Sequence, residues 1–189
     1  MKQVLSISLF VAFTILFFGN TQQIFAQKAA APKIGTSGIE LGNEVGQDLG
    51  DFEAYGSDST ILKLSQLRGK LVLVVLWNSL CGHCVTENSK FIKTYEKYHN
   101  TKFNNGNGFD VYAIGLDKER ATWVDAIVKQ NYPWSNNVYV LDSWKDAEVR
   151  FFGVKNLPGT FLIDGNGIVL TKIFTAEELE ITLEKYVEK

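Results

Sequence analysis

Residues 71–87 of the 189-residue chain read LVLVVLWNSLCGHCVTE and contain both of its cysteines, Cys81 and Cys84. The first seven residues are all apolar and mostly β-branched or leucine, which predicts a central strand buried on both faces of a sheet. From residue 82 to about residue 98 apolar side chains recur at helical spacing, which predicts a helix. The cysteines therefore fall where a strand ends and a helix begins, the usual location of function in α/β folds.

The rest of the chain also alternates between strand-like and helical segments. Strands are expected at 109–116, 138–141, 160–163 and 168–173, and helices at 117–130 (capped by Asp117), at 143–152 and after a capping box that starts at Thr175. A helical turn is expected at 64–70, short irregular strands within 45–60, and a polar loop at 100–108. This order predicts one α/β domain with a central mixed sheet, helices on both faces, parallel strands first and an antiparallel hairpin late.

The front of the chain has the order of a secretory signal. Lys2 precedes an uncharged apolar run, and polar residues then lead to Ala26. The run is shorter than the roughly 20 residues that cross a bilayer comfortably, so we expect a signal peptide at 1–26 that is cleaved after Ala26, with an uncleaved membrane anchor as the alternative. Residues 27–44 are expected to form a linker or extended arm before a domain at 45–189. Because no cysteine lies near this signal, a lipid anchor is excluded.

Composition narrows the choice of partners. The formal net charge is −2 and the chain has no basic run, which gives no reason to propose nucleic acid or an anionic membrane as a partner. A single Cys-x-x-Cys offers two thiolates, whereas structural zinc usually has four ligands. The second histidine, His99, stands at the far end of the predicted helix, so we expect no metal site and no cofactor.

The placement of the cysteines favours redox chemistry over a structural staple. A bridge across so short a loop constrains the unfolded chain very little. At a helix N-terminus the partial positive charge and free N–H groups stabilise a thiolate, which is the nucleophile in disulfide exchange. Cys81, at the end of the strand, is therefore the predicted attacking thiol. Cys84, almost one turn inside the helix, is the predicted resolving thiol of a Cys81–Cys84 redox disulfide.

Three neighbours of the cysteines are candidate site residues, each with a plainer alternative. His83 could stabilise the Cys81 thiolate and shift the couple toward oxidising potentials, or be a solvated loop residue. Glu87, three residues after Cys84 on the same helix face, is a candidate to move the Cys84 proton, or an acid that favours the helix dipole. Trp77 is a candidate to stack beside the site and contact substrate, or a core residue.

The stretch 64–89, LSQLRGKLVLVVLWNSLCGHCVTENS, resembles the thioredoxin superfamily, and within it the exported TlpA/ResA-like thiol-disulfide oxidoreductases. The shared features are a Leu-x-x-Leu-x-Gly-Lys lead-in, an apolar strand, Trp77 four residues before the first cysteine, and Glu87 three after the second. The later run 157–164, LPGTFLID, is similar to the family's cis-proline loop and final hairpin. The resemblance covers about residues 45–189 and implies a thioredoxin-like fold with an N-terminal extension.

The resemblance also implies functional details that the residues alone do not show. Pro158 should be cis and stand beside Cys81, with the backbone of Leu157 free to pair with an extended substrate segment. The implied partners are cysteine-containing protein substrates and a membrane or periplasmic redox partner, in the periplasm or otherwise outside the cytoplasm. Cytochrome c maturation is a role known at the level of the family. The family often has proline where this chain has His83, and Cys-Gly-His-Cys is similar to protein disulfide isomerase, so the direction of electron flow stays open.

Two other functional classes remain as alternatives. A peroxiredoxin-like peroxidase shares the fold but needs a Thr or Ser three residues before its reactive cysteine in a Pro-led motif, and Asn78 stands there. A non-catalytic binding domain would use the cysteines as a structural disulfide. Cysteine reactivity distinguishes this domain from an oxidoreductase, because a staple needs no activated thiol.

Overall fold

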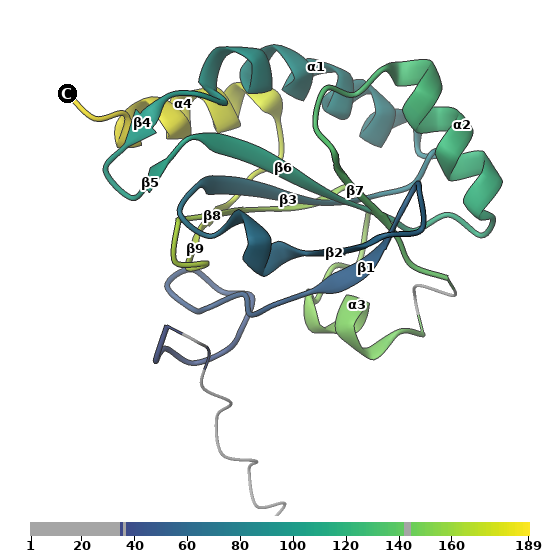
Figure 1. The fold of residues 1–189 in the computed structure, drawn as a ribbon, viewed down its shortest axis with the longest axis horizontal. Helices are drawn as coiled ribbons and strands as arrows, with labels where there is room; N and C mark the ends of the chain where they lie inside the picture. The colour runs from purple at the N-terminus through teal and green to yellow at the C-terminus, as the bar shows by residue number, and fades with distance from the viewer. Residues whose placement is uncertain (1–34, 36, 142–144) are drawn as a thin grey trace, which may run out of the picture. The chain divides into compact units, whose positions relative to one another are not determined.

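The computed structural model describes residues 35, 37–141 and 145–189, all within the compact unit Pro32–Lys189 (Figure 1). Its strands are β1 (Glu53–Gly56), β2 (Ile61–Lys63), β3 (Leu71–Trp77), β4 (Lys102–Phe103), β5 (Gly106–Asn107), β6 (Phe109–Gly115), β7 (Asn136–Tyr139), β8 (Gly159–Ile163) and β9 (Val169–Lys172). Its helices are α1 (Gly82–Tyr98), α2 (Arg120–Gln130), α3 (Ala147–Phe151) and α4 (Ala176–Tyr186), with a 3-10 turn, η1 (Leu64–Leu67). The predicted signal peptide lies outside the described residues. In the part that is described, no helix has the length and apolar character needed to cross a membrane.

The apolar run at 71–77 forms β3, a central strand whose seven side chains are all buried, as predicted. β3 pairs in parallel with β6, which places Trp77 opposite Gly115, and antiparallel with β8. The main sheet has the order β2-β1-β7-β6-β3-β8-β9. Because β6 and β7 are also parallel while β8 and β9 form an antiparallel hairpin, the predicted mixed sheet is confirmed. The expectation that parallel strands come first is wrong, because β1 pairs antiparallel with both β2 and β7.

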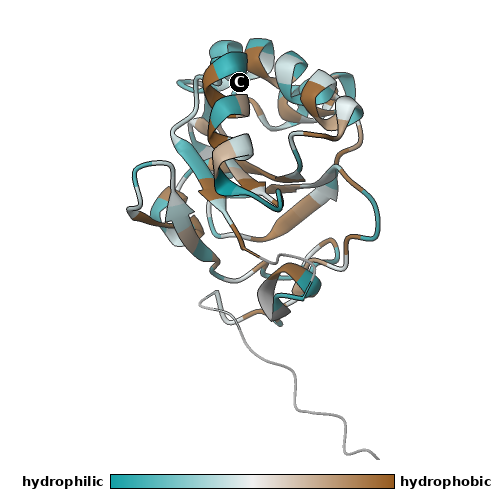
Figure 2. Cartoon of the chain, turned by 90° about the vertical axis from the view of Figure 1, so that its right-hand side faces the viewer, coloured by the Kyte–Doolittle hydropathy of each residue, from teal (hydrophilic) through white to brown (hydrophobic). Residues whose placement is uncertain are grey.

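Alternate side chains of β3 point into two separate cores. Helices α1, α2 and α4 cover one face, where Leu73, Val75 and Trp77 are completely buried (Figure 1). α3 and η1 cover the other face, which includes Val72 and Val74. Figure 2 shows hydrophobic colouring along the central strands and a mixture of hydrophobic and hydrophilic colouring on the helices. Burying each large apolar side chain contributes about 1.5–3 kcal/mol, so β3 is firmly held and its carboxyl end is a rigid support.

Other local expectations also differ from the structure. The polar segment expected as a loop at 100–108 contains the short β4–β5 hairpin, because Asn107 N–H donates to Gly69 O (2.6 Å) and Gly165 N–H donates to Asn105 O (2.8 Å). The helix expected at 143–152 is shorter: α3 ends at Phe151, and residues 142–144 lie outside the described part. The capping box at Thr175 is confirmed, since Thr175 and Glu178 exchange side-chain-to-backbone hydrogen bonds.

Part of the predicted linker or arm lies against the domain. Asp48 is completely buried and accepts a hydrogen bond from the Ser37 hydroxyl (2.7 Å). Gly42 N–H donates to the Asp48 carbonyl (2.9 Å). The buried Asp48 carboxylate needs donors such as the Ser37 hydroxyl and the Gly50 N–H, because burial without them is costly. Residues 37–48 therefore form an ordered edge beside β9, to which Gly46 N–H also bonds.

Candidate active site

Cys81 and Cys84 form a disulfide where β3 leads into α1. The S–S distance is 2.08 Å and the two Cα atoms are 5.2 Å apart. Cys81 is the N-cap of α1, and the Cys84 N–H donates to Cys81 Sγ at 3.1 Å. This backbone N–H is one of the donors that a helix start leaves without an intrahelical partner. The helix N-terminus therefore directs both its dipole and an N–H group at the Cys81 sulfur.

The two sulfurs differ in exposure. Cys84 is completely buried, whereas Cys81 is partly exposed. Cys81 Sγ lies 3.9 Å from the carbonyl oxygen of Leu157. The Leu157–Pro158 peptide bond is cis, as the family resemblance implied, and stands beside the disulfide. Of the two sulfurs, only that of Cys81 is open to an external disulfide.

A buried carboxylate holds the loop that presents Cys81. Asp117 is 3% exposed and accepts hydrogen bonds from both the backbone N–H (3.1 Å) and the hydroxyl of Ser79. Asn78 supports the same loop, because its amide donates to Leu116 O (2.9 Å) and its carbonyl oxygen accepts from Leu80 N–H (2.8 Å). The predicted role of Asp117 as a helix cap is wrong: α2 begins at Arg120, and its N-cap makes no side-chain hydrogen bond. Sequence reasoning missed Asp117 as a supporting residue of the site.

A signal for this residue was present in the sequence. Asp117 comes just after β6, and Ser79 comes just after β3. Parallel neighbouring strands end at the same edge of a sheet, so polar residues after both strands are expected to meet there. The register of β3 and β6 places the two strand ends, Trp77 and Gly115, side by side.

Glu87 is buried on α1, and its carboxylate is occupied by partners outside the disulfide. It accepts from Lys90 Nζ (2.6 Å) and from the backbone N–H of Ala176 at the start of α4 (3.0 Å). Burial raises the pKa of Glu87, but the hydrogen bonds from Lys90 and Ala176 and the charges of Lys90 and His83 outweigh it, so the pKa lies below its ordinary value. A carboxylate with a lowered pKa is a weak base at neutral pH, so this geometry favours a structural link between α1 and α4.

The Glu87 link should make stability depend on pH. Because the pKa is lowered in the folded state, the carboxylate stabilises the fold above its unfolded value near 4.5, and this contribution is lost as pH falls through the folded value. Glu87→Gln should therefore reduce the free energy of unfolding by about 1–3 kcal/mol at pH 7 and by less at pH 3.5, as measured by urea unfolding. Glu96→Gln, on the exposed side of the same helix, is the control. Equal losses at both pH values would contradict the charge-based account.

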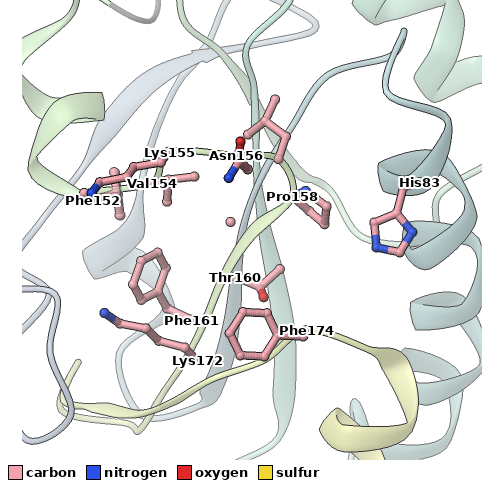
Figure 3. Close-up of a pocket in the computed structure, with 13 residues that line it drawn as sticks. His83, Phe152, Val154, Lys155, Asn156, Pro158, Thr160, Phe161, Lys172 and Phe174 are labelled. Atoms are coloured by element: carbon pink, nitrogen blue, oxygen red, sulfur yellow. The ribbon is translucent and has the colours of Figure 1, made fainter.

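His83 and Trp77 have different surroundings. His83 is exposed and lines a pocket of about 460 Å³ that also includes Leu157 and Pro158 (Figure 3). Trp77 is completely buried and packs edge-on against Tyr132, with ring centroids 5.6 Å apart. The alternative of Trp77 as a core residue fits this position, since a fully buried ring presents no surface to a substrate.

The geometry around the disulfide suits thiol–disulfide exchange. It combines a partly exposed sulfur at a helix N-terminus, a buried second sulfur and an open pocket beside a cis-proline loop. Within the described ranges, no group of three or more His, Cys, Asp or Glu side chains could hold a metal ion. The class that this fold and site define is the thioredoxin-like thiol-disulfide oxidoreductases.

Comparisons with known proteins agree with this class. The family model AhpC/TSA matches residues 45–172, more than two thirds of the chain, and the chain belongs to this family. The curated protein "Thiol-disulfide oxidoreductase ResA" of Bacillus thuringiensis is 26% identical over 77% of this chain and 78% of its own length. The thioredoxin domain of a thiol-disulfide oxidoreductase from Bacteroides vulgatus superposes with a TM-score of 0.68 and 25% identity, over 77% of this chain and 99% of that domain.

A further structure shares the fold. A thiol-disulfide oxidoreductase from Bacteroides fragilis has a TM-score of 0.64 and 22% identity, over 74% of this chain and 98% of its own. The expected thioredoxin-like fold, its TlpA/ResA-like character and the enzyme class are thereby confirmed. The relatives are named thiol-disulfide oxidoreductases, and not peroxidases or binding domains. A peroxidatic site needs Thr or Ser three residues before its reactive cysteine, whereas this chain has Asn78, whose amide supports the loop before Cys81.

Proposed function

We propose that the chain exchanges disulfides with extracytoplasmic protein partners through its Cys-Gly-His-Cys dithiol. In the reduced state, the Cys81 thiolate attacks a substrate disulfide, forming a mixed disulfide and releasing one substrate thiolate. The Cys84 thiolate then attacks the Cys81 sulfur, which releases the second substrate thiolate and closes the Cys81–Cys84 bond. Two electrons pass to the substrate, and the reverse sequence oxidises a substrate dithiol.

The observation that carries this proposal is the unequal environment of the two sulfurs. Attack requires access and a stabilised thiolate, and Cys81 has partial exposure and a hydrogen bond from the Cys84 N–H (3.1 Å). Resolving the mixed disulfide requires a second sulfur that can reach Cys81 but is shielded from other disulfides. Cys84 meets this requirement because it is completely buried. A plain staple would need neither feature.

His83 is proposed to tune the reduction potential, because it is exposed between the cysteines and can stabilise the thiolate. Replacing it with alanine should destabilise the reduced form and make the potential more negative by about 30 mV, a tenfold change in the equilibrium constant. Equilibration with glutathione buffers, followed by alkylation of free thiols, measures this shift. His99→Ala, at the far end of α1, is the matched control. An unchanged reduction potential in the His83→Ala variant would mean that His83 is a solvated loop residue without a role in tuning.

The potential of the unmodified chain also decides the direction of exchange. A value near −120 to −180 mV favours an oxidant or isomerase, and a value below about −250 mV favours a reductant. Cytochrome c maturation, in which apocytochrome c is reduced, would require a reductant. This role is an expectation from the family.

We also propose that the protein is exported. The support is the charged, apolar and small-residue order of residues 1–26, followed by a domain at 45–189. The proposed partners are cysteine-containing proteins of the same compartment and a periplasmic or membrane redox partner. Sequencing the N-terminus of the chain recovered outside the cytoplasm tests this, since a mature protein that retains residue 1 would contradict cleavage after Ala26.

A further inference from the structure

The pocket beside the disulfide extends well beyond the cis-proline loop. Its lining residues come from α1, from the segment between α3 and β8, and from β8, β9 and the turn after β9, and they are His83, Phe152, Gly153, Val154, Lys155, Asn156, Leu157, Pro158, Gly159, Thr160, Phe161, Lys172 and Phe174. Figure 3 shows His83 at one side and Phe152, Val154 and Lys155 at the other, with Phe161, Lys172 and Phe174 along one edge. The pocket therefore leads from His83, the residue between the cysteines in the motif, to a second, distant end.

The pocket has an exposed aromatic ring on its lining. Phe152 (3% exposed) and Phe161 (2% exposed) line it as part of the core, whereas Phe174 is 68% exposed and presents its ring to solvent. A phenylalanine that remains mostly in water gains by contact with another apolar or aromatic group. Thr160 is 5% exposed, and its hydroxyl has no hydrogen-bond partner among the described residues.

The charges around the pocket are of one sign. Lys155 and Lys172 are its charged lining residues, and no Asp or Glu lines it, although the whole chain has a net charge of −2. Lys155 has no ion-pair partner among the described residues. Lys172 Nζ is bonded to Glu44 Oε1 at 2.8 Å, and the Glu44 side chain is 70% exposed. A carboxylate is thus already accommodated at this end, and a solvent-exposed ion pair is weak enough to be exchanged for another carboxylate.

We propose that this pocket selects substrate segments that carry an aromatic residue and acidic residues near the reactive cysteine. The aromatic side chain packs against the exposed ring of Phe174, and the acidic side chains pair with Lys155 and Lys172. This inference rests on the proposed function, because the segment is held so that its disulfide reaches Cys81.

The position of the pocket favours an extended polypeptide over other occupants. Leu157, whose carbonyl oxygen lies 3.9 Å from Cys81 Sγ, makes no backbone hydrogen bond with another described residue, and the β3–β8 pairing ends at Gly159. An extended segment can use these free backbone groups at one end of the pocket and the lysines at the other. Electrostatic complementarity of this kind acts chiefly on specificity and association rate.

Two disulfide-linked peptide dimers test the proposal. Each peptide has one cysteine flanked on both sides by phenylalanine, followed by two aspartates in one peptide and two lysines in the other. The reduced full-length chain is mixed with each peptide dimer at low and at high salt, and the rate at which the Cys81–Cys84 bond closes is measured. The rate at which dithiothreitol reduces each peptide dimer is measured separately and corrects for the intrinsic reactivity of the peptide disulfide. The double variant Lys155→Gln/Lys172→Gln is compared with Lys93→Gln/Lys102→Gln, which has the same net charge and alters exposed lysines outside the pocket.

The acidic peptide should react roughly five- to tenfold faster than the basic peptide at low salt, and the ratio should approach one in about 0.5 M salt. The pocket double variant should lose most of this preference, and the control double variant should keep it. Phe174→Ala should slow the reaction of the acidic peptide. It should have little effect on the reaction of an acidic peptide whose phenylalanines are replaced by alanine. Equal rates for both peptides, or a preference that survives in the pocket variant, would overturn the inference. If neither peptide reacts with the wild-type chain, the proposed function itself fails.

Discussion

Replacing Cys81 with serine should abolish disulfide exchange, lowering the rate of insulin reduction by at least about a thousandfold. The serine hydroxyl is not ionised at neutral pH and cannot form a disulfide. Cys84 cannot substitute, because it is completely buried below the surface that a substrate can reach. Insulin turbidity with dithiothreitol as electron donor measures the rate. Turnover by this variant at a rate near that of the wild type would eliminate Cys81 as the attacking thiol.

Cys84→Ser should give the complementary result. Cys81 keeps its exposed position and its hydrogen bond from the backbone N–H of residue 84, which the substitution retains. The variant should therefore attack a substrate and then remain attached to it as a mixed disulfide, visible on non-reducing gels and lost on adding dithiothreitol. A double variant without either cysteine is the control for adventitious adducts. If Cys84→Ser turned over normally and accumulated no adduct, the resolving role would be wrong.

The features that could be predicted from sequence are those in which a short stretch determines its own structure. Residues 71–77 form a buried strand because all seven are apolar, and α1 begins after Cys81 where the pattern changes period. The position of the cysteines at this junction followed directly. The family motifs supplied what periodicity could not, since nothing in the isolated residue Pro158 indicates a cis peptide beside Cys81.

The features that could not be predicted depend on contacts between distant segments. Glu87 has the position of a proton carrier near Cys84, but Ala176, 89 residues away, provides the N–H that occupies its carboxylate. The β4–β5 hairpin forms in a segment with loop composition because Gly69 and Gly165 offer it backbone partners. Sequence patterns describe the intrinsic preference of a segment, and tertiary hydrogen bonds overrode that preference at both places.

Asp117→Ala should cause a large loss of stability. The Asp117 carboxylate is 3% exposed and accepts hydrogen bonds from the backbone N–H (3.1 Å) and the hydroxyl of Ser79. Ser79 lies two residues before Cys81, so these bonds hold the loop that carries the cysteine. Hydrogen bonds to a charged group contribute about 1.5–3 kcal/mol, and removing the acceptor leaves the Ser79 N–H without a partner in a partly buried loop. Since water can reach the half-buried Ser79 and recover part of this, we expect a loss of about 2–3 kcal/mol in urea unfolding.

Comparison with milder changes separates the hydrogen bonds from other effects of Asp117→Ala. Asp117→Asn keeps one oxygen acceptor and should lose about half as much, whereas Asp125→Ala, at an exposed site on α2, should change stability by less than about 0.5 kcal/mol. Ser79→Ala combined with Asp117→Ala should lose less than the sum of the two single changes, because the hydroxyl bond is counted in both. Loosening this loop should also slow the attack of Cys81 on a small disulfide several-fold, because the sulfur is no longer held in one orientation. Full stability together with an unchanged rate in Asp117→Ala would show that β3 and α1 alone position Cys81, and that the buried carboxylate is dispensable.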